Sequence, residues 1–306
     1  MPSYWSTKKA FFYLIGSTCL TLTLSVGGFF VYRNWKIKRM TDEKCRITAI
    51  MQTGPEKEAL KTSYLAELLD LSVDSPSQLY AFNLNKAIEK LLQSPLIAQA
   101  EVKRIPPGTL YIDYSVRKPI ALLADYANTA IDKEGYIFPI APFFSPKQFA
   151  EIYLGLPSFG SEEDGMGRRG GQWKTPLQNV YLSLAFDLLK FLEAFSGQDG
   201  VRIKRIDVSN AFAPSLGQRE IVLIAEDELV CQGGHKELIC LFPTILRLAP
   251  KDYQTQLNHF FSLRHNMLED YKRQLFFTKE GGRFASRIID LRIPQLAFID
   301  NTTSQK

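Results

Sequence analysis

The feature that most constrains this chain is a long uncharged run near its start. From Ala10 to Tyr32 no residue is charged, and most side chains are apolar. A bilayer core needs about 20 apolar helical residues, so this run can cross a membrane as one helix. The Ser and Thr residues within it can bond to backbone carbonyls of their own helix. The sequence therefore predicts a transmembrane helix at residues 10–32, preceded by a short cytoplasmic tail at 1–9.

A cleaved signal peptide is the alternative to a permanent anchor. Signal peptides have a shorter apolar core and end in a small-residue cleavage site. This run ends instead in Arg33-Asn34-Trp35-Lys36, which contains no such site. An uncleaved anchor is the favoured interpretation.

The orientation of the anchor stays open on charge alone. Two lysines precede the run, and four basic residues follow it closely: Arg33, Lys36, Lys38 and Arg39. Counted simply, the positive-inside rule puts the C-terminal side in the cytoplasm, but the rule weakens for long translocated segments.

The rest of the chain has the composition of a folded protein. The whole chain is 45% hydrophobic and 23% charged, which is typical of globular domains. The roughly 270 residues after the anchor can bury one or two cores. The net charge of +5 is modest, and no basic block carries interleaved aromatics, so we expect no nucleic-acid partner.

The cysteines do not form a disulfide framework. Cys19 lies in the predicted span, which leaves Cys45, Cys231 and Cys240 outside it. Cys231 and Cys240 could pair in an oxidising compartment, but buried free thiols are favoured. His235 between them does not complete a zinc spacing, so no metal or cofactor is expected.

The first part of the soluble region predicts the order strand, helix, helix, strand, strand. Asn83 is suited to cap the second helix, and Pro106-Pro107-Gly108 separates the last two strands. The predicted elements are a strand at 45–51, helices at 60–69 and 84–92, and strands at 98–105 and 110–114.

The region after Pro119 predicts a larger mixture of strands and helices, so the fold class is α+β with a curved sheet. Hydrophobic periodicity predicts strands at 120–124, 129–132, 136–138, 203–208 and 220–225, and a helix at 177–195 ended by Gly197. Residues 238–248 are interpreted as a helix interrupted by Pro243. Residues 259–279 are an insertion or a helical excursion. Residues 283–298 are interpreted as a closing strand that contains Pro294.

A glycine-rich segment at 158–171 invites comparison with a phosphate-binding loop. It contains two arginines, but no Gly-Lys-Ser/Thr follows and no apolar strand leads into it. We interpret it as a surface loop.

Several short motifs, in this order, resemble the bacterial cell-division family FtsQ, called DivIB in Gram-positive bacteria. They are Pro95-Leu96-Ile97-Ala98, Val102-Lys103-Arg104-Ile105-Pro106, Gly108-Thr109-Leu110-Tyr111-Ile112, Arg117-Lys118-Pro119-Ile120-Ala121, the hairpin Ile131–Phe138, Leu156-Pro157, and Ile289-Asp290-Leu291-Arg292. The chain departs from the family where Val116 replaces a usual Glu, where Ile293 replaces a usual Tyr, and in the polar segment 259–279.

The resemblance implies a domain order and a topology. It implies a cytoplasmic tail at 1–9, a span at 10–32, a linker at 33–44, a POTRA domain (βααββ) at 45–117, an FtsQ-type β domain at 118–300 and a tail at 301–306. It also implies an inner-membrane protein with its N-terminus in the cytoplasm and its C-terminal domain in the periplasm, which overrides the simple charge count.

The resemblance further implies a scaffold of the divisome and not an enzyme. Its partners would be FtsB-like and FtsL-like proteins and, through them, the septal peptidoglycan synthases. Family members capture partners by strand addition at the last sheet edge. The expected partner-binding residues here are Ile289, Asp290, Leu291, Arg292, Ile293, Pro294, Gln295, Leu296, Ala297 and Phe298.

The residues themselves support this edge at one point and leave one alternative open. Pro294 lacks an N–H, so a strand that contains it belongs at a sheet edge or a bulge. Strand alternation would put Leu291, Ile293 and Gln295 on one face, with Ile293 and Leu296 as apolar anchors and Arg292 as a charged contact at the rim. The alternative is that Leu291 and Ile293 simply face the core.

Two other functions remain alternatives. A membrane-anchored cell-wall enzyme would need a nucleophile with its base, paired carboxylates or metal ligands, and the chain has neither S-x-x-K nor G-x-S-x-G nor H-E-x-x-H. A POTRA-bearing assembly or translocation factor usually carries several POTRA units or a barrel, whereas this sequence predicts one unit.

Overall fold

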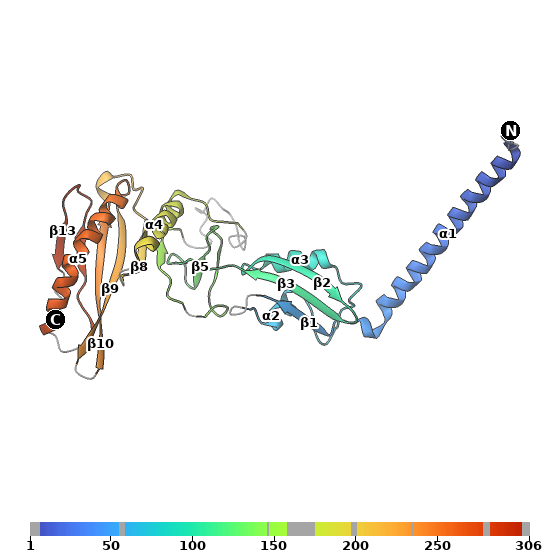
Figure 1. The fold of residues 1–306 in the computed structure, drawn as a ribbon, viewed down its shortest axis with the longest axis horizontal. Coiled ribbons are helices and arrows are strands. Elements are labelled where there is room, and N and C mark those ends of the chain that lie inside the picture. The colour runs from blue at the N-terminus through green and yellow to red at the C-terminus, as the bar shows by residue number, and fades with distance from the viewer. Residues whose placement is uncertain are drawn as a thin grey trace, which may run out of the picture. The chain divides into compact units, whose positions relative to one another are not determined.

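The computed structural model describes residues 7–54, 59–145, 147–157, 175–196, 201–233, 236–277 and 282–301. The chain divides into two compact units, Met1–Val116 and Arg117–Lys306. Each unit is described by itself (Figure 1). The glycine-rich segment 158–171 and Gly197 lie outside the described residues.

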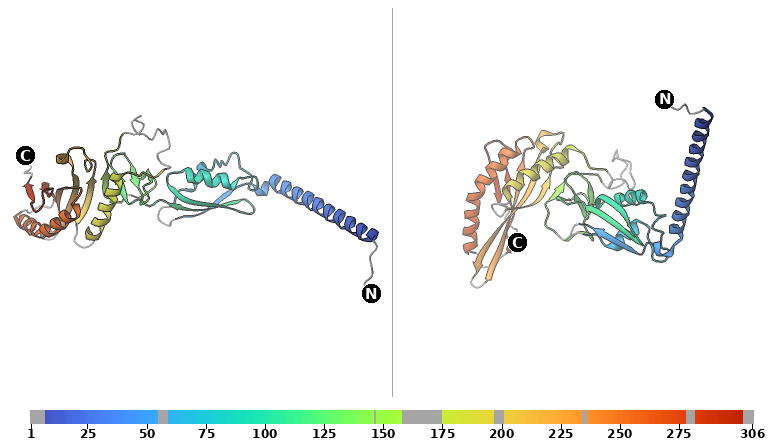
Figure 2. Two further views of the ribbon diagram at one scale, coloured as in Figure 1. Left: turned by 90° about the horizontal axis from the view of Figure 1, so that it is seen from above. Right: turned by 45° about the vertical axis from the view of Figure 1, so that its right-hand side comes forward.

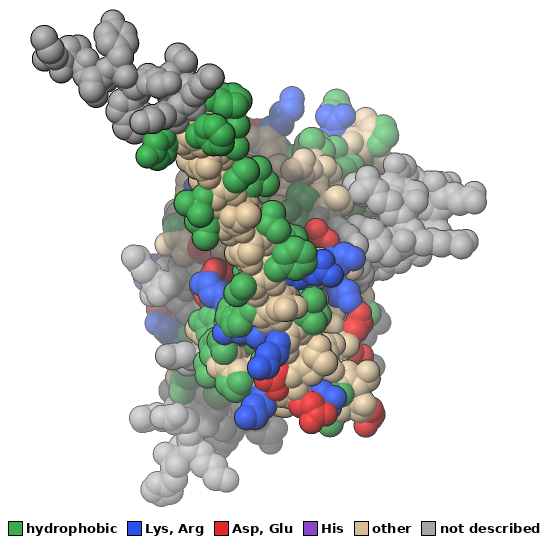
Figure 3. Space-filling view, turned by 90° about the vertical axis from the view of Figure 1, so that its right-hand side faces the viewer, with side chains coloured by type: hydrophobic (Ala, Val, Ile, Leu, Met, Phe, Trp, Pro, Cys, Tyr) green, Lys and Arg blue, Asp and Glu red, His purple; other side chains and the backbone are tan. Residues whose placement is uncertain are grey.

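The first unit begins with one long helix, α1, at Thr7–Thr41. From Phe11 onward it is long and apolar enough to cross a membrane, and none of its most apolar stretch is buried against protein. Thr18, Thr21 and Thr23 donate their hydroxyls to carbonyls one turn earlier in the helix, at 2.9–3.0 Å. Figure 3 shows the hydrophobic side chains that cover this helix. The helix extends past Tyr32 to Thr41, so most of the segment predicted as a linker is helical.

The compact part of the first unit has the predicted order of strands and helices. The elements are β1 at Ala49–Thr53, α2 at Thr62–Leu68, α3 at Leu84–Gln93, β2 at Ile97–Ile105 and β3 at Thr109–Val116. The strands lie in the order β1-β3-β2, with β1 parallel and β2 antiparallel to β3.

Local sequence signals explain where these elements begin and end. The side chain of Asn83 accepts a hydrogen bond from the backbone N–H of Lys86 at 3.1 Å, which confirms the predicted helix cap. The first strand begins at Ala49 and not at Cys45, because Glu43–Cys45 forms the 3-10 turn η1, capped by Asp42. A Cβ at Gly108 would meet the carbonyl oxygen of Arg46 at 2.3 Å, so the turn between β2 and β3 requires glycine.

The second unit is built on one sheet with the strand order β13-β12-β10-β9-β8-β7-β4-β5-β6, and with β11 beside β10. The helices α4 and α5 cover one face of this sheet (Figures 1 and 2). Leu188, Ile206, Leu223 and Leu246, which are fully buried, lie in the core between the helices and the sheet. The elements are β4 Ala121–Leu123, β5 Thr129–Ile131, β6 Ile137–Pro139, β7 Glu151–Tyr153, α4 Val180–Ser196, β8 Val201–Asp207, η3 Leu216–Gln218, β9 Ile221–Gly233, β10 Lys236–Leu248, α5 Tyr253–Phe277, β11 Gly282–Arg283, β12 Arg287–Asp290 and β13 Phe298–Asn301.

The helix predicted at 238–248 is wrong, because this segment is the long strand β10. Its even-numbered residues from Cys240 to Leu248 are buried, which is strand periodicity. The carbonyls of Leu241 and Arg247 accept bonds from the β11–β12 side, so alternation turns the nitrogen of Pro243 to that side too. On that side, β10 pairs with β11 as far as Leu241–Arg283 and with β12 from Thr244–Arg287 onward. Pro243 lies between these two ladders, so its missing N–H breaks no hydrogen bond of either.

The closing strand predicted at 283–298 is also wrong as a single element. Three short strands replace it, and a turn at Ile293–Gln295 joins β12 to β13. Pro294 lies in this turn, and Gln295 has a φ of 63°. The polar segment 259–279 is helical through Phe277 and is part of α5. It carries buried core residues such as Phe260 and Tyr271, so it is not a surface insertion.

Two sequence motifs that lie apart in the chain meet in the second unit. The guanidinium of Arg117 bonds to Asp132 at 2.8 Å and lies over the ring of Tyr136 at 3.6 Å. Asp132 in turn accepts the N–H groups of Glu134 and Tyr136, which holds the predicted hairpin turn around Gly135 (φ 88°). The Arg-x-Pro-x-Ala junction and the Asp-x-x-Gly hairpin are therefore parts of one contact.

Cys240 is a buried free thiol. It faces Leu229 across the hairpin, while Cys231 faces Leu238. For Cys240 the structure confirms the buried-thiol interpretation.

Candidate partner-binding edge

The last strand of the large sheet, β13, is an edge strand. Its pairing with β12 is antiparallel and runs from Asp290–Phe298 to Arg287–Asn301. Among the described residues no strand lies on its other side. The predicted partner-binding segment 289–298 therefore spans the end of β12, the turn and the first residue of β13.

The direction of the backbone groups on β13 follows from the neighbouring ladder. The N–H of Leu291 bonds to Arg247 of β10, so alternation turns the backbone of Ile289 toward β10 as well, and that of Asp290 toward β13. Phe298 and Asp300, which face Asp290 and Ile288, then bond back to β12. The N–H and C=O of Ile299 point outward, away from the sheet.

An apolar surface surrounds this free edge. Four large hydrophobic side chains in the last turn and strand are about half exposed: Ile293 at 50%, Leu296 at 54%, Phe298 at 55% and Ile299 at 51%. Such a cluster beside unpaired backbone groups is a template for another chain.

The alternative that both Leu291 and Ile293 face the core holds for one residue only. Leu291 is 3% exposed and belongs to the core cluster, whereas Ile293 is half exposed in the turn. The predicted alternation past Asp290 is wrong because β12 ends at that residue. Both predicted anchors, Ile293 and Leu296, are exposed.

Arg292 does not extend freely from the rim. It bonds to Asp290 at 2.7 Å and pairs with Glu220 at 3.2 Å, and Arg247 pairs with the same two carboxylates at 3.6 and 2.7 Å. Partial burial raises the pKa of Asp290, but the hydrogen bonds from Arg292 outweigh burial and hold that pKa below its usual value. This network of four charges fixes the end of β12 and so the start of the turn.

A groove runs between α5 and the 291–297 segment. It consists of two adjoining hollows of about 410 and 440 Å³ that share His259, Leu291, Gln295 and Leu296. Asp252 lies at one end and Leu263 at the other. The groove lies beside the free edge, so a segment that pairs with β13 can also contact it.

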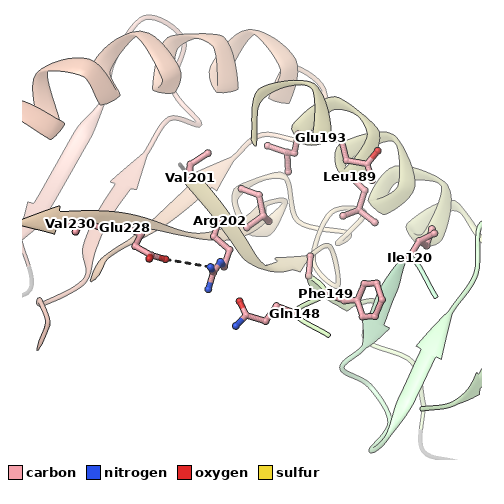
Figure 4. Close-up of a pocket in the computed structure, with 12 residues that line it drawn as sticks. Ile120, Gln148, Phe149, Leu189, Glu193, Val201, Arg202, Glu228 and Val230 are labelled. Carbon is pink, nitrogen blue, oxygen red and sulfur yellow. Dashed lines mark hydrogen bonds and ion pairs between the residues drawn. The ribbon is translucent and has the colours of Figure 1, made fainter. Parts of the chain in front are cut away.

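A separate hollow, of about 590 Å³, lies between the end of α4 and strands β8 and β9 (Figure 4). Its wall is mostly apolar, with Leu189, Leu192 and Val230 among its residues. Arg202 of β8 pairs with Glu228 of the adjacent strand β9 at 3.4 Å (Figure 4). The ion pair joins the neighbouring strands β8 and β9 at the wall of this hollow.

The described residues contain no cluster of three or more His, Cys, Asp or Glu that could hold a metal ion. The features that sequence reasoning missed are the outward backbone of Ile299 and the groove on α5. The outward backbone of Ile299 depends on where β12 ends, and the positive-φ turn at Gln295 that follows β12 carries no clear signal in the sequence. The second depends on which face of α5 packs against the sheet.

The fold and the N-terminal helix fit a single-pass membrane protein whose folded region follows the span. Residues 57–113 match the family model described as POTRA domain, FtsQ-type. The match runs from before α2 into β3. It supports an FtsQ/DivIB-like family for this chain, as the sequence motifs predict. No curated protein matches the chain.

Proposed function

We propose that this protein is a bitopic scaffold of the bacterial divisome that links FtsB-like and FtsL-like partners to septal peptidoglycan synthesis. The FtsQ-type POTRA match supports the division role, and the apolar helix α1 supports the single membrane anchor. The N-terminus lies in the cytoplasm and both folded units lie in the periplasm.

The observation that carries the proposal is the free edge of β13. A partner segment in extended conformation pairs with the outward N–H and C=O of Ile299 and adds one strand beyond β13. The exposed side chains of Ile293, Leu296 and Phe298 supply apolar contacts. Backbone pairing provides affinity in this mode, and the side-chain contacts provide specificity.

The proposed contact residues extend the segment 289–298 by one strand residue. Ile289 and Leu291 are buried and support the edge from inside. Asp290 and Arg292 fix the turn through their ion pairs. Ile293, Pro294, Gln295, Leu296, Ala297 and Phe298 are exposed and face a partner directly, together with Ile299.

A proline at Ile299 tests strand addition directly. The Ile299→Pro variant removes the outward N–H but leaves the β12–β13 bonds, which Phe298 and Asp300 make. The matched control, Ile299→Ala, keeps the N–H and shortens the side chain. The full-length protein is extracted from membranes in mild detergent, and the co-purified FtsB-like partner is quantified.

We expect Ile299→Pro to lose the partner and Ile299→Ala to retain most of it. Removal of a central contact of this kind costs about 2 kcal/mol or more of binding free energy, or roughly thirtyfold in affinity. Equal recovery of the partner with Ile299→Pro, at unchanged thermal stability, would refute docking at this edge.

The orientation is tested with a reporter. Alkaline phosphatase fused after Lys306 is active only outside the cytoplasm, so we expect activity. An active cytoplasmic reporter at the same position, with an inactive phosphatase, would restore the simple charge count.

The scaffold proposal also excludes an enzymatic role. We expect the purified protein neither to cleave nor to synthesise peptidoglycan. Turnover above a heat-inactivated control, abolished by one polar substitution, would contradict this part of the proposal.

A further inference from the structure

The end of α1 carries a concentrated positive charge. The helix continues past the apolar run without a break to Thr41. Within Arg33–Thr41 there are four basic residues and no acidic one: Arg33, Lys36, Lys38 and Arg39. Figure 3 shows Lys and Arg side chains gathered around the lower end of the hydrophobic run.

The helix holds these cations at the depth of lipid headgroups. Each residue advances the helix by about 1.5 Å, so Arg33–Arg39 extends through roughly 10 Å beyond the apolar run. The headgroup layer is about 5–8 Å thick on each side of the hydrocarbon core. Arg33, Lys36 and Arg39 follow at every third position and lie along one side of the helix. Trp35, an aromatic residue suited to the interface, lies beside them.

Most of this charge is not neutralised by the protein. Among the described residues, Arg33, Lys36 and Lys38 form no ion pair, and their side chains are exposed. Arg39 lies over the ring of Trp35 at 3.5 Å and donates to the hydroxyl of Tyr80 at 3.2 Å, which leaves its positive charge intact. The next acidic residue, Asp42, lies beyond the end of the helix.

We propose that this basic helix end binds anionic phospholipid headgroups on the side of the membrane where the folded units lie. Cations close to an anionic surface are attracted strongly, each by a factor of about five in partitioning. The apolar run brings the cations to that surface, so lipid phosphates are the nearest source of negative charge. The contact fixes the depth of the span and of the residues that follow it, and it holds for either orientation of the helix.

In the orientation proposed above, with the folded units outside the cytoplasm, these residues carry a cost in membrane insertion. Arg and Lys close to a span disfavour transfer of the adjoining segment out of the cytoplasm. Only two lysines, Lys8 and Lys9, balance them on the other side. Attraction to anionic headgroups is a direct physical compensation for that cost.

The test measures which lipids surround the full-length protein. The chain is reconstituted in phosphatidylcholine nanodiscs that contain a trace of spin-labelled phosphatidylglycerol or spin-labelled phosphatidylcholine. Electron paramagnetic resonance gives the immobilised fraction of each label, and their ratio gives the preference for the anionic lipid. The variant Arg33→Gln/Lys36→Gln/Lys38→Gln removes the three unpaired cations, and glutamine preserves helix propensity.

A matched control removes charge from the other end of the helix, in the variant Lys8→Gln/Lys9→Gln. We expect the native chain to prefer the anionic lipid, the triple variant, which lacks three cations, to lose at least about fivefold of that preference, and the control to keep most of it. High salt should weaken the native preference, because exposed charges are screened. The proposal is overturned if the native chain shows no preference, if the triple variant matches the native chain, or if the control loses as much as the triple variant.

Discussion

The buried ion pair between α5 and the sheet provides the sharpest test of how the second unit is held together. The guanidinium of Arg264 bonds through two nitrogens to one oxygen of Asp227, both at 2.8 Å. The two side chains are 5% and 1% exposed. The other carboxylate oxygen of Asp227 is buried and has no hydrogen-bond partner among the described residues.

Replacement of Arg264 by leucine should destabilise the second unit strongly. The change leaves the Asp227 carboxylate buried without its counter-ion, and breaking a buried pair in this way costs about 3–5 kcal/mol of unfolding free energy. For a domain of this size that corresponds to a fall in melting temperature of roughly 10 °C. The double variant Arg264→Leu/Asp227→Asn should recover part of the loss, because position 227 then carries no unpaired buried charge.

The pH dependence of the unfolding free energy tests the same ion pair, and its sign follows from the pKa of Asp227. Burial raises the pKa of Asp227 above its ordinary value, although Arg264 opposes the shift. A raised folded-state pKa means that the native state binds the proton more tightly than the unfolded chain. The stability from this group is therefore fully present below the ordinary pKa and is lost as pH rises through the raised value. Without Arg264 the pKa rises further, so Arg264→Leu should regain stability as pH falls from 7 toward 5.

The assay is thermal unfolding of the full-length protein in detergent micelles, followed by circular dichroism at pH 7.5 and pH 5. The native chain and the double variant are the references at each pH. If Arg264→Leu melts within about 2 °C of the native chain at pH 7.5, or if its loss grows at pH 5, the reasoning is refuted.

Two further substitutions test the packing of each unit. Asn83→Ala removes the cap of α3 and should cost the first unit about 1 kcal/mol, measured by urea unfolding; a loss below 0.3 kcal/mol, within the noise on that scale, would show that the cap is dispensable. Phe242 is 1% exposed and stacks with Tyr271 at 4.0 Å and with Phe284 at 4.2 Å, so Phe242→Ala should cost about 3–5 kcal/mol in the same measurement. A smaller loss than for the surface control Phe298→Ala would contradict the role of this stack.

Local signals in the sequence predicted the first unit well. The helix cap at Asn83 and the break at Pro106–Gly108 each act within a few residues. Such signals depend on side chains next to the backbone that they satisfy, so they are readable without tertiary contacts. The order strand, helix, helix, strand, strand followed from them and is confirmed.

The candidate edge was predictable in location but not in form. The Asp-Leu-Arg motif indicated that residues near 290 lie at the end of the sheet. The sequence could not indicate that β12 ends at Asp290, because the charge network that fixes this end depends on Glu220, which lies about 70 residues earlier in the chain and pairs with Arg292 and Arg247. The outward backbone of Ile299 depends on the same register.

The anchor, the first unit and the hairpin at Asp132–Gly135 were predictable from the sequence, since each depends on hydrophobic length or on interactions between near neighbours. The strand at 238–248 and the place of α5 in the core depend instead on contacts between distant segments. A short apolar run has no periodicity that separates a buried strand from a buried helix. The partners of β10 and α5 settle the matter, since β9 pairs with β10 along its whole length and Asp227 holds Arg264 against the sheet.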